Sequence, residues 1–484
     1  MERLERLLSQ RGTRHLLLSL HMLMMVAAFA VFGKQPSGDQ ATYLGLAEGL
    51  ERGAFSYWHG ILEQPPIETY RTHGYPAFLW LVRRFAQDTT AVRVAQSVLH
   101  LLTLLLLLRW AGRRPDGLLR QNVLLLLLLP QFQLLHYAHE ILPETLMAFL
   151  CTAIALTGMG TPGMRRAVLL GLLIAAGFWV RPVLLLFPLF VLLADLLLAR
   201  GAERITMLRG HTITLVVFLL AAPLPFGLWN LRTHGVFKPV PISGSAVVSD
   251  LGFWQHRLPG YGSMRYFHYN FFGREILPWV DDDAAARWYT IYNAQWDRIE
   301  AAAEPFMSEA DRRDIPIMDA GHKDLFITRS AGITLALDSI IRREMMANIQ
   351  AEPGYYLATR CYTAIRLWIT NINRPMAHWV FTPDAGDRPL VGWPAGPGGW
   401  VAMLAPFLIT AVTFGLGGLF LLWRILRDRR SWHERRYALL LIAYLWMIHI
   451  PMVIQSRYLV PVHALVVASI AMAWVEWRAG RTSA

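Results

Sequence analysis

Asp39 is the residue of this chain best placed for acid–base chemistry. It directly follows the first long apolar segment, within Gly38-Asp39-Gln40-Ala41, and Arg71-Thr72-His73-Gly74-Tyr75-Pro76 comes later in the same connection. A carboxylate just outside a membrane span can accept a proton from a substrate hydroxyl at the membrane surface. A second interpretation stays open, in which Asp39 caps a short helix that runs to about Leu50, because Asp is a favoured capping residue.

The composition predicts an all-α polytopic membrane protein. Hydrophobic residues make up 55% of the chain and charged residues 17%, whereas soluble domains are about a quarter charged. A helix needs about 20 apolar residues to cross a membrane. By this criterion we expect about ten transmembrane helices, with a break at Arg181-Pro182 between two of them. The apolar runs are 16–32, 92–108, 118–135, 142–159, 168–180, 183–198, 211–228, 401–423, 437–453 and 458–474.

The basic residues indicate topology rather than a nucleic-acid partner. The net charge is +12, but arginines gather in every second connection between the apolar runs. They lie at positions 3–14, 109–120, 165–166, 200–209, 424–436 and 478–481. Since cytoplasmic loops carry an excess of Lys and Arg, we expect both termini in the cytoplasm. The protein would be a multi-pass protein of the cytoplasmic (inner) membrane, with Asp39 facing the periplasm or exterior.

Three parts of the chain differ in composition. Residues 1–230 read as an N-terminal transmembrane module with a first outer loop at 34–90, and residues 399–484 as the C-terminal transmembrane helices. Residues 231–398 read as an extracytoplasmic, mostly helical domain. Within it, apolar residues at helical spacing near 333–346 and 355–369 predict amphipathic helices along the membrane surface. Their other faces carry Arg342 and Arg343 in the first segment and Arg360 and Arg366 in the second. Cys151 and Cys361 offer no disulfide framework.

The remaining unusual polar residues of the membrane portion fall on the predicted outer face. They are His139, Glu140, Glu144, Arg181, Arg232 and Arg457. Ionisable residues at membrane depth are costly, and they usually pair with one another or face a cavity. Their convergence on one side therefore predicts a site. His139, Glu140 and Glu144 are candidate ligands of a divalent metal, while Glu144 could equally stabilise the start of its own helix.

The order of these segments resembles the GT-C glycosyltransferases. More narrowly, it is similar to the branch that contains the protein O-mannosyltransferases and the aminoarabinose transferase of lipid A. The resemblance covers roughly residues 1–235 and the last two spans. Beside Asp39 and the 71–76 segment it rests on Ile141-Leu142-Pro143-Glu144-Thr145-Leu146, Val180-Arg181-Pro182, Trp229-Asn230-Leu231-Arg232-Thr233-His234-Gly235 and Arg457-Tyr458-Leu459-Val460-Pro461. His73 stands where family members often have Pro, and Gln40 follows Asp39 where many carry a second carboxylate.

The resemblance implies a fold and an activity. A GT-C-like enzyme moves a sugar, with inversion, from a polyprenyl-phosphate carrier to a hydroxyl of a glycan, lipid or protein acceptor on the outer face of the membrane. Asp39 would then be the catalytic base. Arg457, Arg181 and Arg232 would bind the donor phosphate, with Glu140 and Glu144 as supporting carboxylates. No cofactor is certain. Gln40 in place of the second carboxylate argues against a metal-binding pair beside Asp39, and a divalent metal held by His139, Glu140 and Glu144 stays possible.

Several of these residues have a plainer interpretation. Arg232 and Arg457 lie at span ends, where arginines commonly contact the headgroups of membrane lipids. Arg71 could position the acceptor or close the first loop by pairing with Glu68 or Glu63. His73 and Tyr75 could likewise position the acceptor or belong to the loop itself.

Two other classes of membrane protein are alternatives. A transporter of lipid-linked glycans should show paired halves and broken helices near the midplane, and no such halves are visible in the sequence. An O-antigen polymerase or ligase also has many spans and an Arg-rich outer loop, but that class lacks a carboxylate directly after the first span. Asp39 therefore favours the glycosyltransferase.

Overall fold

The regular structure of the chain is helical. The computed structural model describes residues 2–31, 38–63, 65–113, 116–198, 203–243, 297–314, 330–368, 408–452 and 456–482, with the single positions 249, 290 and 294. Within these residues the only β pairing is an isolated bridge between His59 and Leu62. The all-α prediction is confirmed for this part of the chain. Of the two predicted domain boundaries, the one at 398–399 lies outside the described residues, and the one at 230–231 falls within the described helix Pro223–His234.

The described helices include α-helices and short 3-10 and π-helical segments. In chain order they are α1 (Glu2–Leu8), α2 (Arg11–Val31), α3 (Gly38–Glu51), α4 (Gly74–Arg83), α5 (Thr89–Gly112), α6 (Gly117–Leu128), α7 (Phe132–Tyr137), α8 (Glu144–Gly158), α9 (Met164–Val180), the 3-10 helix η1 (Pro182–Leu184), α10 (Phe187–Leu198), α11 (Glu203–Ala221), α12 (Pro223–His234), the 3-10 helix η4 (Glu304–Phe306), α18 (Ala331–Ala351), α19 (Pro353–Arg366), the π-helical η5 (Ala411–Leu416), α22 (Gly417–Arg427), α23 (Arg429–His449), the 3-10 helix η6 (Ser456–Leu459) and α24 (Val460–Thr482).

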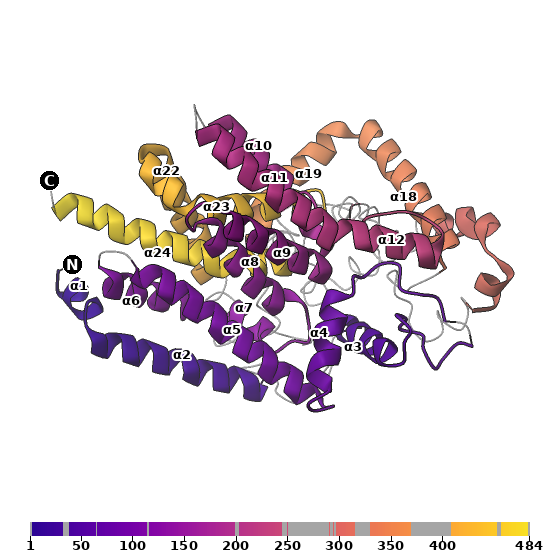
Figure 1. The fold of residues 1–484 in the computed structure, drawn as a ribbon, viewed down its shortest axis with the longest axis horizontal. Coiled ribbons are helices and arrows are strands. Elements are labelled where there is room, and N and C mark those ends of the chain that lie inside the picture. Colours follow the sequence, from indigo (N-terminus) through magenta and orange to yellow (C-terminus); the bar gives the residue numbers. More distant parts are fainter. Residues whose placement is uncertain are drawn as a thin grey trace.

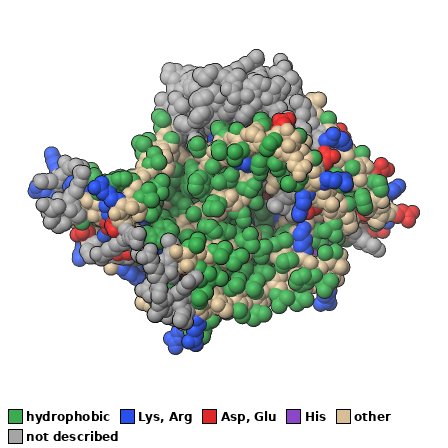
Figure 2. Space-filling view, turned by 90° about the horizontal axis from the view of Figure 1, so that it is seen from above, with side chains coloured by type: hydrophobic (Ala, Val, Ile, Leu, Met, Phe, Trp, Pro, Cys, Tyr) green, Lys and Arg blue, Asp and Glu red, His purple; other side chains and the backbone are tan. Residues whose placement is uncertain are grey.

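Five helical stretches are long and apolar enough to cross a membrane. They are Arg11–Ala30, Thr89–Gly112, Met207–His234, Leu408–Arg427 and Arg457–Ala479. Shorter apolar helices cover Gly117–Leu128, Glu144–Gly158 and Pro182–Leu197. Figure 2 shows hydrophobic side chains over the middle of the visible face and charged side chains toward its two ends. The chain is therefore a helical membrane protein, while the expected total of about ten spans stays a prediction.

The body of the molecule is built around α24. Most of its side chains are buried, and it packs against α6, α8, α22 and α23. The two chain ends lie at the same end of this body, whereas α3, α4 and α12 lie at the opposite end (Figure 1). Asp39, in α3, is therefore far from both termini.

The helix break at Arg181-Pro182 is confirmed. Helix α9 ends at Val180, Arg181 has an extended backbone, and Pro182 opens η1. Proline has no N–H to donate to the preceding turn, so the chain cannot continue α9 and changes direction here. As a result, the Arg181 side chain projects from the end of a buried helix.

The 71–76 segment is docked on this same end of α9. A Cβ atom on Gly74 would lie 2.4 Å from the backbone of Trp179, so only glycine allows the close approach. The Thr72 hydroxyl donates to the Val180 carbonyl at 3.3 Å. These contacts hold the first loop, with Arg71, beside the segment that carries Arg181.

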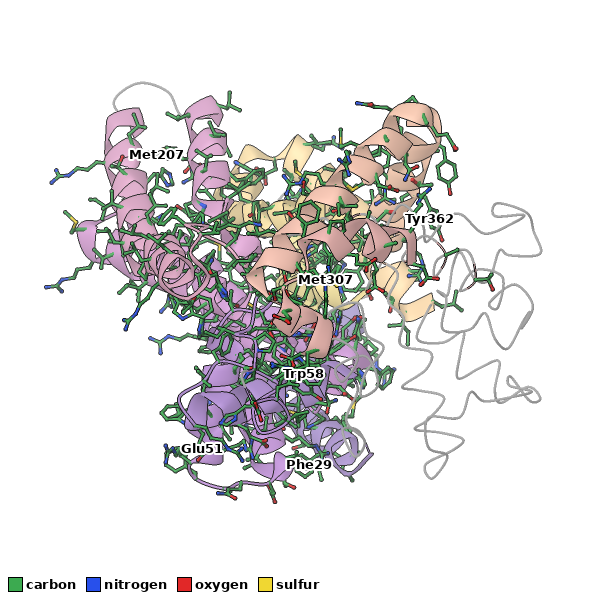
Figure 3. All side chains as sticks on the ribbon, turned by 90° about the vertical axis from the view of Figure 1, so that its right-hand side faces the viewer. Phe29, Glu51, Trp58, Met207, Met307 and Tyr362 are labelled. Atoms are coloured by element: carbon green, nitrogen blue, oxygen red, sulfur yellow. The ribbon has the colours of Figure 1, made fainter. Side chains whose placement is uncertain are left out.

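A second set of contacts fastens the 229–243 segment to the first loop. The Asn230 side chain donates to the carbonyls of Lys238 and Val240, and the Ser243 N–H donates to the Thr69 carbonyl at 2.9 Å. A small apolar cluster around Trp58, with Met307 packed against it, joins the first loop to α18 and to the residues near 299–307 that precede it (Figure 3). The first loop is thus held from two sides.

Helix α19 buries its arginines in the protein and leaves apolar side chains exposed, while its predicted position along the membrane surface stays a prediction. Arg360 and Arg366 are buried, whereas Leu357 and Ile365 are 65% and 67% exposed. The Arg360 guanidinium donates to the carbonyls of Ile450 and Met452, at 3.0 and 3.2 Å. Carbonyl groups at the end of a helix such as α23 lack partners within the helix, so the arginine satisfies them and turns the apolar side of α19 outward.

Candidate active site

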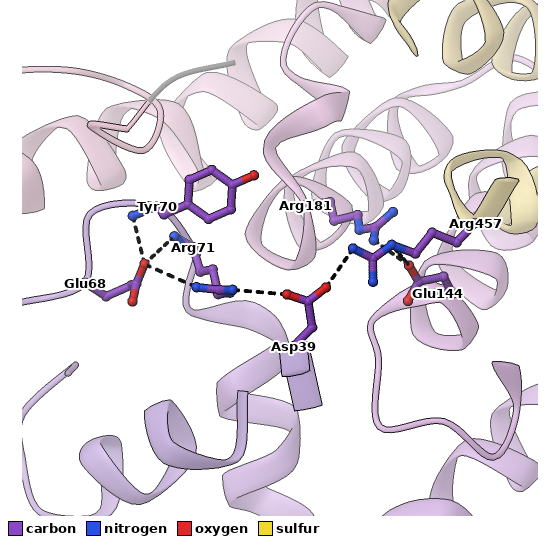
Figure 4. A network of polar contacts seen from close by, with 7 residues as sticks. All are labelled: Asp39, Glu68, Tyr70, Arg71, Glu144, Arg181 and Arg457. Carbon is purple, nitrogen blue, oxygen red and sulfur yellow. Dashed lines mark hydrogen bonds and ion pairs between the residues drawn. The ribbon is translucent and has the colours of Figure 1, made fainter. Parts of the chain in front are cut away.

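A network of ion pairs (Figure 4) includes Asp39 of α3, at the end of the body opposite the termini (Figure 1). It joins carboxylates and guanidinium groups from helix starts and connections that are far apart in the sequence. Its members are Asp39, Glu68, Glu144, Arg71, Arg181 and Arg457. The structure thus brings five residues of the predicted site together, with Glu68, one of the two expected partners of Arg71, beside them.

The Asp39 carboxylate lies between two arginines. Its Oδ2 is 2.7 Å from Nη2 of Arg457, and its Oδ1 accepts a hydrogen bond from Nη2 of Arg71 at 3.3 Å. The predicted helix is present as α3, but it already begins at Gly38. Asp39 is therefore inside the first turn, and its carboxylate points to the arginines rather than capping the helix.

Glu144 forms the deep side of the network. Its side chain is fully buried at the first residue of α8. Its Oε1 accepts a hydrogen bond from Nη2 of Arg181 at 2.5 Å and lies 3.8 Å from Nε of Arg457. Arg457 is consequently shared between two carboxylates, Asp39 and Glu144.

Glu68 anchors Arg71. Oε1 of Glu68 accepts hydrogen bonds from the backbone N–H groups of Tyr70 and Arg71, at 2.8 and 3.0 Å, and lies 3.9 Å from Nη1 of Arg71. Of the two partners expected for Arg71, the structure selects Glu68. The rings of Tyr43 and Tyr70 lie 5.4 and 5.3 Å from the Arg71 guanidinium, within cation–π range.

The arginines keep Asp39 ionised. Burial raises the pKa of Asp39, but the charges of Arg457 and Arg71 and their hydrogen bonds outweigh this effect, and the pKa is lowered to about 2. Burial lowers the pKa of Arg71, whereas Glu68 and Asp39 raise it, and the net pKa is above its ordinary value. In this state Asp39 is a charged but weak base.

Glu140 is a second carboxylate beside this network. It accepts a hydrogen bond from Gln40, the neighbour of Asp39 in the chain, and Nδ1 of His136 lies 3.8 Å from it. Burial raises the pKa of Glu140 to about 7, against opposing effects of Arg93 and Gln40. Burial also lowers the pKa of His136 to about 3, so this imidazole is neutral at physiological pH.

The three candidate metal ligands point in different directions. Glu144 faces Arg181 and Arg457, while the His139 ring packs edge-on against Phe29 at 5.5 Å between ring centroids. In the part of the chain that the structure describes, no three His, Cys, Asp or Glu side chains are grouped so as to hold a metal ion. The residues predicted for this role do not fit it.

Three other predicted residues lie apart from the network. Arg232 is exposed in the last turn of α12 and forms no ion pair with a carboxylate among the described residues. His73 stacks on Phe55 at 3.9 Å and packs edge-on against Trp229 at 4.4 Å. Its burial lowers its pKa to about 4. The buried Tyr75 hydroxyl donates to Gln96 at 2.6 Å. His73 and Tyr75 therefore build the frame around the site.

Exposure shows which members of the network a ligand can reach. The side chains of Asp39, Arg457 and Arg181 are 28%, 23% and 17% exposed. Those of Arg71, Glu68 and Glu144 are 6%, 0% and 0% exposed. The open side thus presents one carboxylate and two guanidinium groups, which can accept a proton and bind an anion respectively.

Sequence reasoning missed the roles of Tyr43, Tyr70 and Tyr458, and it named Glu68 only as one of two possible partners of Arg71. Glu68 and Tyr70 directly precede the 71–76 segment, Tyr43 is one helical turn after Asp39, and Tyr458 follows Arg457. The Arg181 guanidinium lies 5.9 Å from the Tyr458 ring. The spacing of Asp39 and Tyr43 on one helical face was the available signal.

Comparison with known proteins gives no match: no protein-family model, no curated protein and no solved structure is similar to this chain at a significant level.

Proposed function

We propose that this protein is an inverting glycosyltransferase that moves a sugar from a polyprenyl-phosphate carrier to an acceptor hydroxyl on the outer face of the cytoplasmic membrane. The observation that supports this most is the open side of the network. Asp39, Arg457 and Arg181 meet there, at the end of the membrane body away from both termini. A base and two fixed cations are the groups that this reaction needs.

The two arginines suit a phosphate that develops charge. When the sugar leaves its carrier, the phosphate oxygen keeps the electron pair of the broken bond and becomes more negative. Guanidinium groups bind phosphate oxygens through paired, charge-assisted hydrogen bonds. Arg457 and Arg181 approach the same Glu144 oxygen, at 3.8 and 2.5 Å, so both can reach one anion placed near it. Cations held in this way stabilise the transition state more than the ground state.

Asp39 suits the acceptor side of the reaction. The acceptor oxygen attacks the anomeric carbon, the carbon–oxygen bond to the phosphate breaks, and the hydroxyl proton passes to the Asp39 carboxylate. A single displacement of this kind inverts the anomeric centre. Proton transfer to a positioned base contributes about a hundredfold or more to the rate. The frame formed by His73, Tyr75 and Gly74 holds the first loop beside Arg181 during the transfer.

The proposal is tested with purified protein in lipid nanodiscs. Wild type should release polyprenyl phosphate from a polyprenyl-phosphate sugar when an acceptor mixture from the cell envelope is added. Arg457→Ala should lower this rate by about tenfold to a hundredfold, the effect of one lost charge-assisted contact. Arg342→Ala is the matched control, because Arg342 is 63% exposed on α18 and pairs only locally with Asp338. Equal rates in the two variants would contradict the proposal.

A further inference from the structure

The anion site in this network is already filled by the protein itself. Each of the three guanidinium groups lies within 4 Å of a carboxylate: Arg71 contacts Asp39 and Glu68, Arg181 contacts Glu144, and Arg457 contacts both Asp39 and Glu144. The described network therefore holds as many carboxylates as guanidinium groups. An arriving phosphate adds negative charge to a balanced cluster, so it must compete with a carboxylate for an arginine.

Arg457 is the arginine that a phosphate can take over with least disturbance. Arg71 is held on both sides and is only 6% exposed, and Glu144 is fully buried against Arg181. By contrast, the contact between Arg457 and Asp39 joins two partly exposed side chains. Arg457 also belongs to the short 3-10 helix η6 rather than to the interior of a long helix. A phosphate would therefore replace Asp39 at Arg457, on the open side of the network.

We propose that Asp39 and Glu144 are resident anions of the phosphate site, which the donor phosphate displaces from Arg457 and which displace the product phosphate in turn. This inference rests on the proposed function. It gives both carboxylates a role in admitting the donor phosphate and in releasing the product phosphate. Before the donor binds, Arg457 and Arg71 hold Asp39 in its weakly basic state. The donor phosphate takes Arg457, and Asp39 keeps only Arg71, so its pKa rises and it becomes a better base.

The same competition returns the site to its starting state. After transfer, Asp39 carries the proton of the acceptor hydroxyl, and the product phosphate holds Arg457 and Arg181. When Asp39 loses this proton to water, its carboxylate regains its charge and competes again for Arg457. The product is thereby expelled. No oxidant, reductant or further reactant is needed, because the proton is the only group that Asp39 gains and loses.

The test is equilibrium binding of a polyprenyl phosphate to purified wild type, Asp39→Asn, Glu144→Gln and Arg457→Ala in nanodiscs. Replacing a resident carboxylate by the corresponding amide keeps the shape of the side chain nearly unchanged but removes its charge. Asp39→Asn and Glu144→Gln should therefore bind the polyprenyl phosphate roughly tenfold to a hundredfold more tightly than wild type. Glu48→Gln is the matched control, since Glu48 is 51% exposed and pairs with Arg83 outside the network. It should bind like wild type.

The outcomes separate this inference from the proposed function. If wild type binds the phosphate, Arg457→Ala does not, and the Asn and Gln variants bind equally or more weakly than wild type, the competition is disproved while the phosphate site remains. If neither wild type nor any variant binds the phosphate, the proposed function itself fails. Because Glu144 is buried and its Gln variant could fold poorly, Asp39→Asn provides an independent second measurement. Its binding should tighten even though its transfer activity is lost, which a purely structural role would not produce.

Discussion

Buried ion pairs occur at both ends of this membrane body, but they are built differently. At the end that carries the termini, Glu476 contacts Arg120 at 2.9 Å and also pairs with Arg435, and Asp195 contacts His211 at 2.6 Å and Arg436 at 3.2 Å. At the opposite end, Asp39, Glu144 and their arginines form the candidate site. Both sets combine the same chemical groups in low-exposure surroundings.

The difference lies in the backbone that carries the side chains. Glu476 and Arg435 project from the interiors of α24 and α23, and Arg120 from the first turn of α6, so each contact ties one helix to another. The candidate site uses the first turns of α3 and α8, the break after α9, the first loop and η6. Residues on helix starts and loops can exchange partners without moving a whole helix. The comparison teaches that the first set holds helices together, whereas the second can respond to a ligand.

The largest expected effect concerns the ion pairs of Glu476 at the end of the molecule that carries the termini. Removing one partner of a buried ion pair leaves an uncompensated charge and costs about 3 to 5 kcal/mol. Glu476→Gln should therefore lower the unfolding temperature in detergent strongly, because both Arg120 and Arg435 lose their acid. The transfer rate per folded molecule should stay near wild type. A thermal unfolding series with an activity assay checks this, and normal stability would show that the two ends do not differ as we describe.

Glu140 should make stability depend on pH. Its folded pKa is about 7, above the ordinary value of 4.5, so between these values the folded protein binds more protons than the unfolded chain. The free energy of unfolding should then fall as the pH rises from 4.5 to 7, by at most about 3 kcal/mol. Unfolding curves of wild type and Glu140→Gln across this range measure it. If the free energy of unfolding of wild type instead increased relative to that of Glu140→Gln as the pH rises, the burial of Glu140 would be contradicted.

Arg181 and Arg232 should differ in their effect on phosphate binding, although both are predicted to bind the donor phosphate. Arg181→Ala loses a charge-assisted contact in a partly buried site, and its affinity for polyprenyl phosphate should fall by about 1.5 to 3 kcal/mol. Arg232→Ala changes an exposed side chain, so its effect should stay within about 0.5 kcal/mol. Binding titrations of the two variants distinguish them. An effect at Arg232 as large as at Arg181 would move the phosphate site toward α12.

Local patterns in the sequence predict much of the frame. The helix after Asp39, the break at Arg181-Pro182 and the helical character of the apolar runs follow from capping preference, the missing N–H of proline and hydrophobicity. All three features depend on the local sequence alone. The close docking of Gly74 on Trp179 explains why the 71–76 segment contains a glycine, although the sequence alone does not identify its neighbour.

The partners within the site depend on tertiary packing and could not be predicted one by one. Nothing near Arg457 in the sequence indicates that it bridges Asp39 and Glu144, and nothing near Arg232 indicates that it points outward. Arg360 likewise turns inward, where it donates to carbonyl groups just beyond the end of α23. Topology rules assign residues to one face of a membrane, but they do not select partners within that face.

The most direct measurement of the central claim is the turnover of a polyprenyl-phosphate sugar by purified wild type and Asp39→Asn. Asparagine keeps the size of the side chain but cannot accept the acceptor proton at neutral pH. The account predicts that transfer falls by about a hundredfold or more, while the unfolding temperature changes little and the polyprenyl phosphate still binds. An Asp39→Asn variant that folds normally and transfers sugar at the wild-type rate would contradict the assignment of Asp39 as the base.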